Sequence, residues 1–238
     1  MELSKRLSAV AGLVSKGNNL VDVGTDHAYL PLWLVTKGIC PKAIAMDVRP
    51  GPLSRAREHV RTYEMEERIE TRMGDGLSPL TYEEISVQEG DPAWTLVISG
   101  MGGLLMERIL SDREDIVRLF SEAILQPQSD IPHFRRFLHE YKLAITEERM
   151  VLEDGKFYPI MKVVPMKTPY TLEELFGEKL LAEKNPVLKQ YLERESRINS
   201  QILESLTGTR SEIGENRRKE ILLYQQQVNE ALAYYSRG

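Results

Sequence analysis

The segment Leu20-Val21-Asp22-Val23-Gly24-Thr25-Asp26-His27 is a short apolar run that ends in an acidic turn containing a glycine. An apolar strand that ends in Asp-x-Gly and leads into a helix is typical of the first turn of a doubly wound α/β sheet, which presents backbone N–H groups to a ligand. This turn is acidic where a phosphate-binding loop is rich in glycine or carries a lysine. It therefore favours a ligand with a cationic or ammonium end over a pyrophosphate.

The same turn also has a purely structural explanation. Gly24 can supply an unusual backbone conformation, and Asp22 can cap the helix that follows. Three further features, each at the end of a predicted strand, favour a ligand site instead.

A second acidic strand end is Asp47, which closes the apolar run Ala43–Met46. A carboxylate at the end of the second strand of such a sheet accepts hydrogen bonds from both ribose hydroxyls of a nucleoside. The alternative is that Asp47 caps the helix whose first turn carries Pro50. The two roles are compatible, because a cap uses backbone donors and a nucleoside would use the outward lone pairs.

Two glycine-bearing loops follow the next predicted strands. Gly74-Asp75-Gly76 follows a strand at Ile69–Met73 and suits an adenine whose exocyclic amine donates to Asp75, although Gly and Asp are also common turn residues. The apolar run Trp94–Ile98 leads into Ser99-Gly100-Met101-Gly102, where glycines let a ligand approach the backbone closely. Ligands of open α/β sheets bind at such carboxyl ends of strands.

These strand ends together predict a binding site for S-adenosylmethionine, whose sulfonium and amino groups match the acidic turn and whose nucleoside matches the later loops. The predicted cofactor-binding residues are Asp22, Gly24, Thr25, Asp47, Val48, Gly74, Asp75, Gly76, Ser99, Gly100, Met101 and Gly102. A dinucleotide-dependent dehydrogenase is disfavoured, because the first turn lacks the three-glycine spacing.

The composition limits the other possibilities. A chain of 238 residues suits one large domain or a domain with an extension, and its net charge of −5 argues against indiscriminate polyanion binding without excluding a basic patch. No apolar run is long enough to span a bilayer, and the N-terminal pattern differs from a secretory signal. The single cysteine, Cys40, excludes an intramolecular disulfide and a cysteine-rich zinc site. We therefore expect a cytoplasmic protein that uses no metal.

The first part of the chain alternates predicted strands and helices, which is typical of βαβ units and a parallel sheet. The apolar runs on either side of Asp154-Gly155 predict a hairpin that adds an antiparallel edge to this sheet, because Asp-Gly is a hairpin turn signal. We predict strands at 19–23, 42–47, 69–73, 95–99, 122–126, 142–153 and 157–165, and helices at 29–37, 53–64, 104–112 and 133–141.

The last third of the chain has a different character. From Thr171 onward it is charged and helical in period, with a helix start at Asn185-Pro186 and a stop at Gly208. We predict a first domain over residues 1–165 and a second over 166–238, the latter a long helical hairpin with coiled-coil character. Its role is open between packing or dimerisation and gripping an extended partner, and we expect a monomer or a weak dimer.

The order of these motifs resembles the bacterial TrmK family. The resemblance covers essentially the whole chain and rests on residues 21–31, 46–47, 74–77, 98–103, 125–128 and 155–160. That family methylates tRNA with S-adenosylmethionine, so the resemblance implies methyl transfer to N1 of adenosine 22, in the D-arm of bacterial tRNA. It also implies a Rossmann-like class I methyltransferase domain followed by a helical coiled-coil domain.

The segment after the fourth predicted strand departs from better-known adenine methyltransferases. Ser99-Gly100-Met101-Gly102 lacks the acid or the Asn-Pro-Pro-Tyr motif that many of them carry. The polar group at the target base must therefore come from elsewhere, and Asp26 is the candidate, because its carboxylate can accept a hydrogen bond from the exocyclic amine as positive charge spreads there. Alternatively, Asp26 caps the next helix or pairs with the ammonium group of the cofactor.

Two neighbours of Asp26 complete the candidate catalytic set. His27 orients Asp26 or binds a phosphate, and Tyr29 stacks on an extruded base, since N1 of a paired adenine is not accessible. For both residues the alternative is structural, as a hydrogen-bonded histidine and a core aromatic.

Basic residues form two candidate RNA-binding patches. One consists of His133, Arg135 and Arg136 on a predicted helix, and the other of Lys5 and Arg6. Charged helix faces are usually only solvated, which is the alternative for both patches.

Two other functions stay open at this point. One is a methyltransferase with a different acceptor, a small molecule or another RNA base. The other is a non-catalytic RNA-binding module with a degenerate nucleoside site, which the intact Gly24, Asp47 and Asp75 disfavour.

Overall fold

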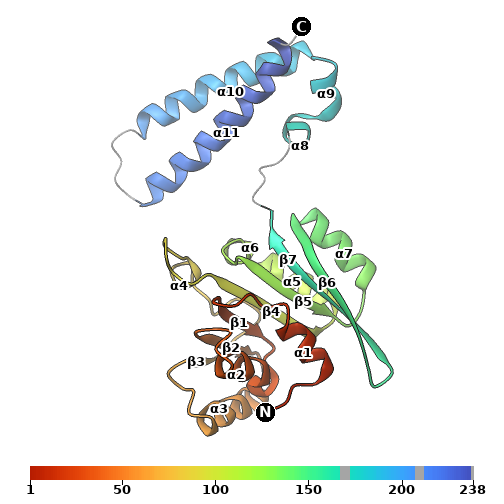
Figure 1. Cartoon of the computed structure of the whole chain (residues 1–238). Helices are drawn as coiled ribbons and strands as arrows, with labels where there is room; N and C mark the ends of the chain where they lie inside the picture. The colour runs from red at the N-terminus through yellow and green to blue at the C-terminus, as the bar shows by residue number, and fades with distance from the viewer. Residues whose placement is uncertain (167–171, 207–211, 237–238) are drawn as a thin grey trace. The chain divides into compact units, whose positions relative to one another are not determined.

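The computed structural model describes residues 1–166, 172–206 and 212–236, and the chain divides into two compact units, Met1–Met166 and Lys167–Gly238 (Figure 1). The first unit holds a large sheet, whereas the described part of the second unit is helical. None of the helices in these three ranges is both long enough and apolar enough to cross a membrane.

A seven-stranded sheet forms the centre of the first unit, in the order β3-β2-β1-β4-β5-β7-β6. Strands β1 to β5 pair with one another in parallel, and β7 is antiparallel to both β5 and β6. The strands are β1 (Asn19–Val23), β2 (Ala43–Asp47), β3 (Ile69–Met73), β4 (Trp94–Met101), β5 (Glu122–Pro127), β6 (Leu143–Glu153) and β7 (Lys156–Pro165). The predicted doubly wound sheet is confirmed, and its strand order reverses between β1 and β4, where such sheets bind ligands.

Helices pack on both faces of the sheet. They are α1 (Lys5–Ala11), the 3₁₀ turn η1 (Asp26–Ala28), α2 (Tyr29–Thr36), α3 (Pro50–Thr62), α4 (Tyr82–Ile85), α5 (Gly103–Asp112), α6 (Glu114–Val117) and α7 (Ile131–Glu140). The sequence predicted α2, α3, α5 and α7 within a few residues of their ends. The predicted helices did not include α1, α4 or α6, and helices of four residues such as α4 and α6 are too short to show a 3.6-residue period.

Side chains of the central strands alternate between two apolar cores. On β4, Leu96 and Ile98 join the core that contains α5 and α7, whereas Val97 joins the core that contains α1, α2 and α3. Burial on both faces explains why the central strands are continuous apolar runs. Cys40 is also fully buried in the second of these cores, as a small packed residue.

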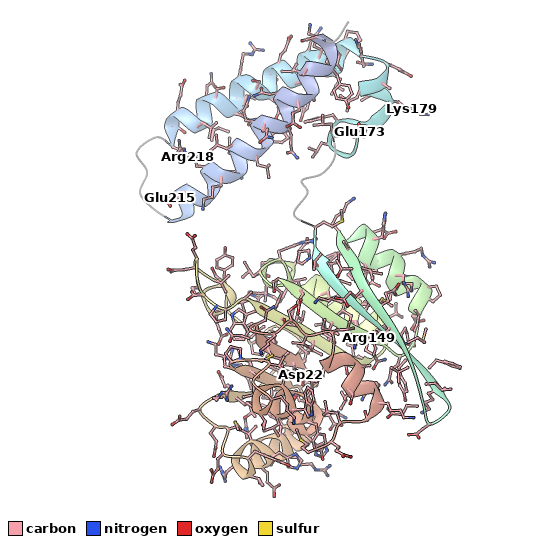
Figure 2. The ribbon with its side chains drawn as sticks, in the orientation of Figure 1. Asp22, Arg149, Glu173, Lys179, Glu215 and Arg218 are labelled. Carbon is pink, nitrogen blue, oxygen red and sulfur yellow. The ribbon has the colours of Figure 1, made fainter. Side chains whose placement is uncertain are left out.

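The predicted hairpin between β6 and β7 is confirmed. Asp154 and Gly155 adopt φ values of 49° and 73°, which is the left-handed pair that lets a two-residue turn match the twist of its strands. This hairpin also holds α1 at both of its ends. The Glu153 carboxylate accepts the backbone N–H of Lys5 at 2.7 Å, and Arg149, labelled in Figure 2, donates to the carbonyl of Gly12 at 2.9 Å.

The second unit is an antiparallel helix pair with two short helices at one end. Its elements are α8 (Leu172–Phe176), α9 (Glu178–Ala182), α10 (Pro186–Ser205) and α11 (Glu212–Ser236). The predicted helix start is confirmed, because the Asn185 side chain caps α10 by accepting two backbone N–H groups. The Tyr235 hydroxyl donates to the carbonyl of Asn185 while Gln225 donates to Ser196, so α10 and α11 run in opposite directions. Gly208, the predicted helix stop, lies outside the described residues.

A buried carboxylate ties the edge of the parallel region to the hairpin. Glu122, only 5% exposed, accepts hydrogen bonds from the Ser15 hydroxyl at 2.6 Å, the Ser15 backbone N–H at 2.8 Å and the Thr95 hydroxyl at 2.8 Å, and it pairs with the Lys162 ammonium at 2.9 Å. Burial alone raises the pKa of this carboxyl, but its donors outweigh burial and hold the pKa below its ordinary value.

We predict that Lys162→Met lowers the free energy of unfolding at pH 7 by about 3 kcal/mol, because it leaves the Glu122 carboxylate buried without its cation. Urea unfolding measures the loss, with Lys156→Met at the exposed end of the hairpin as the control. Because the pKa of Glu122 is lowered in the folded state, the stability it contributes is present above its unfolded pKa and is lost as the pH falls through its folded pKa. The difference between wild type and Lys162→Met should shrink over that range; equal stability of the two proteins at pH 7 contradicts the account.

Candidate functional site

A cavity of about 500 Å³ opens at the carboxyl ends of the parallel strands. All the predicted cofactor-binding residues except Gly102 line it, namely Asp22, Gly24, Thr25, Asp47, Val48, Gly74, Asp75, Gly76, Ser99, Gly100 and Met101. Of the three candidate catalytic residues, Asp26 and Tyr29 line the cavity and His27 does not. The convergence follows from the parallel sheet, whose strands all end on the same side.

Gly24 adopts a backbone conformation that favours glycine, and it lies close to the flexible end of Met101. Its φ is +75°, in the left-handed region, and a Cβ atom on it would lie 2.3 Å from the Met101 methyl group. The prediction that this turn presents its backbone N–H groups to a ligand is wrong for Gly24 and Thr25, however. Those of Gly24 and Thr25 both donate to the carbonyl of Met46 on the neighbouring strand, at 2.8 and 2.9 Å, so this turn offers the cavity space rather than donors.

Asp22 is a buried carboxylate inside the first unit (Figure 2), 5% exposed. Burial raises its pKa to about 6, and the nearby Thr25 hydroxyl and Arg6 guanidinium only partly oppose that rise. It caps no helix, because α2 begins after Ala28 without a side-chain cap. The Thr25 hydroxyl is itself buried without a well-formed hydrogen bond to any described residue. A buried carboxyl with a raised pKa, beside a buried hydroxyl without a well-formed hydrogen bond, is typical of a site that a ligand completes.

Asp47 is buried at the end of β2, and one of its oxygens accepts the backbone N–H of Arg49 at 2.8 Å. The capping alternative is wrong, because Arg49 itself is the N-cap of α3 and no side chain caps that helix. The other oxygen of Asp47 has no hydrogen-bond partner among the described residues, so it is free to accept from a ligand.

Asp75, in contrast, is engaged. Both of its oxygens accept hydrogen bonds from Arg108 on α5, at 2.8 and 2.9 Å, and this guanidinium lowers the pKa of Asp75. The sequence did not single out Arg108, which also lines the cavity. An adenine amine therefore needs either an oxygen lone pair that Arg108 leaves free or a movement of Arg108.

Arg6 lies in the cavity rather than on the outer surface. One of its nitrogens donates to the Ser99 hydroxyl at 2.8 Å and to the Gln126 amide oxygen at 3.1 Å, and its guanidinium lies over the ring of Tyr158. Gln126 is fully buried and also accepts the backbone N–H of Gly100. Gln126 was not predicted from the sequence as a site residue; a glutamine after the apolar residues Ala123–Leu125, near the carboxyl end of a strand, was the available signal.

The turn that carries Asp26 is left-handed at three successive residues. Asp26, His27 and Ala28 have φ values of 26°, 66° and 60°. The Asp26 side chain is 69% exposed and does not cap α2. The His27 nitrogen Nε2 lies 3.4 Å from both Asp26 and Arg55, and since a guanidinium only donates, this atom cannot accept from Arg55 and donate to Asp26 at once. The ring of Tyr29 stacks on that of His27, with centroids 5.5 Å apart.

The candidate RNA-binding side chains differ in whether their charge is already neutralised. On α7, His133 contacts Glu107 at 2.7 Å and Arg135 pairs with Glu148, whereas Arg136 is exposed with no ion-pair partner in the described ranges. The Lys5 side chain is likewise exposed. Within residues 1–166, 172–206 and 212–236, no group of His, Cys, Asp and Glu side chains is arranged to hold a metal ion.

Comparison with known proteins identifies the family of this chain. A model described as a methyltransferase domain matches residues 3–161. A curated Bacillus subtilis relative, named tRNA (adenine(22)-N(1))-methyltransferase, is 35% identical over 161 residues, which are 68% of this chain and 64% of that protein. The crystal structure of B. subtilis TrmK is 28% identical, with a TM-score of 0.63 over 97% of this chain and 99% of that one.

A third relative was solved with a ligand. It is a Streptococcus pneumoniae protein, a candidate tRNA (m1A22) methyltransferase in complex with S-adenosyl-L-methionine, 32% identical, with a TM-score of 0.63 over 97% of this chain and 100% of that one. The chain belongs to the TrmK family. The family resemblance expected from the motifs is thus confirmed, as is the Rossmann-like methyltransferase fold of the first unit. The curated TrmK relative is longer than the matched part, since the alignment spans 64% of its length.

We predict that Asp22→Asn raises the free energy of unfolding above pH 7 by about 3 kcal/mol, the cost of ionising a buried carboxyl whose pKa is near 6 rather than 3.8. Because the folded-state pKa is raised, the cost is present above pH 6, declines as the pH falls from 6 to 4, and is absent below that range. Thermal unfolding of this TrmK protein and its variant at several pH values measures the effect. The exposed Glu66→Gln is the control, and a difference that does not depend on pH contradicts the prediction.

Proposed function

We propose that this protein transfers the methyl group of S-adenosylmethionine to N1 of adenosine 22 in tRNA, in the cytoplasm. The observation that carries the proposal is the buried carboxyl of Asp22, whose pKa burial raises to about 6, in a cavity whose rim also presents Asp47 and Asp75. The support from relatives is the named activity of the B. subtilis protein and the bound ligand of the S. pneumoniae protein.

The methionyl end of the cofactor is a zwitterion, and the cavity has a group for each charge. Asp22 is placed to accept hydrogen bonds from the ammonium group, which would also lower the raised pKa of this carboxyl. Arg6, which we had expected to contact RNA, lies beside Asp22 in the same cavity and is placed to hold the carboxylate. Gly24 lets this part of the ligand approach the backbone, because no Cβ atom fills the space.

The nucleoside end of the cofactor matches the two other acidic residues, Asp47 and Asp75. The free oxygen of Asp47 is placed to accept from the ribose hydroxyls, and Asp75 from the adenine amine. The bound cofactor supplies an electrophilic methyl group on a sulfonium. The contribution of this chain is to fix the position of that group relative to the incoming base, since an in-line displacement depends strongly on alignment.

Asp26 is the candidate catalytic residue. N1 of adenine has an in-plane lone pair and needs no deprotonation, but positive charge spreads to the exocyclic amine as the methyl group is transferred. A carboxylate that accepts from this amine stabilises the transition state more than the ground state, and it can take the amine proton. Asp26 lines the cavity with an exposed side chain and no competing cap, and Tyr29 beside it offers a ring for the base.

On the RNA side, we propose that the α7 patch acts mainly through Arg136. The charge of Arg135 is already compensated by Glu148, and His133 is held by Glu107. Lys5, at the start of α1 and exposed, is a second candidate for phosphate contact. The second unit contributes an antiparallel helix pair, which we propose contacts an extended part of the tRNA.

The function predicts a specific product. Purified protein, incubated with S-adenosylmethionine and an unmodified bacterial tRNA transcript, should yield 1-methyladenosine at position 22, and a transcript with guanosine at that position should gain no methyl group. Mass spectrometry of nuclease digests locates the modification. Methylation of another atom or another base would establish a different acceptor, and binding of tRNA without any transfer would favour an RNA-binding module.

We predict that Asp26→Asn lowers kcat about 100-fold, because the amide cannot take a proton and stabilises the developing charge poorly. The dissociation constant of S-adenosylmethionine, measured by isothermal titration, should change less than about threefold, since Asp26 is assigned to the base rather than to the cofactor. The matched control is Asp91→Asn in an exposed loop. Unchanged transfer removes Asp26 from catalysis, and a loss confined to cofactor affinity makes it a binding residue.

A further inference from the structure

The left-handed turn Asp26–Ala28 needs an external support. Residues other than glycine rarely adopt positive φ, and here three of them do so in succession. Such a conformation persists only where surrounding contacts hold it. The Ala28 N–H donates to the Thr25 carbonyl at 3.1 Å, a bond that is local to the turn.

The support comes from His59 on α3. Its Nδ1 atom lies 3.0 Å from the backbone carbonyl of His27. A carbonyl oxygen only accepts, so Nδ1 carries the proton and donates. The His59 ring also packs against the side chains of the turn, with its centroid 5.6 Å from that of His27 and 5.2 Å from that of Tyr29.

We infer that His59 is a positioning residue for methyl transfer: its hydrogen bond to the carbonyl of His27 holds the left-handed turn that directs Asp26 and Tyr29 into the cavity. This inference rests on the proposed function for its kinetic consequence. His59 does not line the cavity, so it touches neither cofactor nor base and acts through the turn.

The contact predicts which kinetic constant changes. Asp22 and Asp47 are set by strands β1 and β2, whose register does not involve His59. Loss of the His59 hydrogen bond therefore leaves cofactor binding nearly intact. It releases Asp26 and Tyr29, so the bound base is less often aligned and kcat falls.

Two substitutions separate the hydrogen bond from the ring. His59→Asn keeps an N–H donor attached to Cγ and loses the ring, whereas His59→Phe keeps a ring and loses the donor. His139→Asn, an exposed histidine on α7, is the matched control. Each full-length variant is assayed for kcat and KM with tRNA, for S-adenosylmethionine affinity by isothermal titration, and for hydrogen exchange of the Ala28 amide.

We expect His59→Phe to lower kcat about tenfold with less than a threefold change in cofactor affinity, and to speed exchange of the Ala28 amide about tenfold. His59→Asn should retain at least half of the wild-type kcat, and His139→Asn all of it. Equal kcat for His59→Phe and His59→Asn, or loss of cofactor affinity in parallel with kcat, overturns the inference.

Two outcomes are interpreted separately: a variant that does not fold, and a wild-type protein that methylates no tRNA. If His59→Phe does not fold, His59→Ala takes its place, and the comparison with His59→Asn decides in the same way. If the wild-type protein methylates no tRNA, the proposed function fails by itself, whereas amide exchange in the variants still tests whether His59 holds the turn. Unchanged exchange at Ala28 in His59→Phe would then refute the inference.

Discussion

The parallel pairing of β1 with β2 and β4 is the constraint on which the site depends. Parallel strands end on the same side, and the reversal of strand order at β1 leaves that side open between the crossovers. Asp22 is carried into this opening by a strand that is buried along its whole length. The resulting desolvation keeps the pKa of Asp22 near 6, and in the proposed function the ammonium group of the cofactor offsets the free-energy cost of ionising this carboxyl.

The part of the cavity beside Asp22 is built from segments that are far apart in the sequence. The hairpin β6–β7 holds α1 through Glu153 and Arg149, and α1 in turn delivers Arg6 to Ser99 at the end of β4 and Gln126 in β5. The hairpin at the edge of the sheet thereby influences the cavity, because the position of the Arg6 guanidinium beside Asp22 depends on a helix that the hairpin anchors.

The local patterns predicted most of the fold. Apolar runs, the Asp154-Gly155 turn and the cap at Asn185 each report a conformation that neighbouring residues decide, and these predictions agree with the structure within a few residues. The four-residue helices were missed because they contain too few residues for a period. The alternative capping roles of Asp22, Asp26 and Asp47 are wrong, because a cap depends on where the first helical turn starts, and α2 and α3 start after Ala28 and Arg49 without a side-chain cap.

From the sequence alone, the acidic strand ends and their order were sufficient to predict most of the residues that line the cavity and, through the motif resemblance, to identify the family. Strand direction and strand ends are local properties, so they can be derived from short segments. The partners of those acids could not be derived: Arg108 for Asp75, Arg6 beside Asp22, and His59 behind the turn of Asp26. Each of these contacts joins residues on different helices and strands, and such residues become neighbours only when burial of two apolar cores packs the helices onto the sheet.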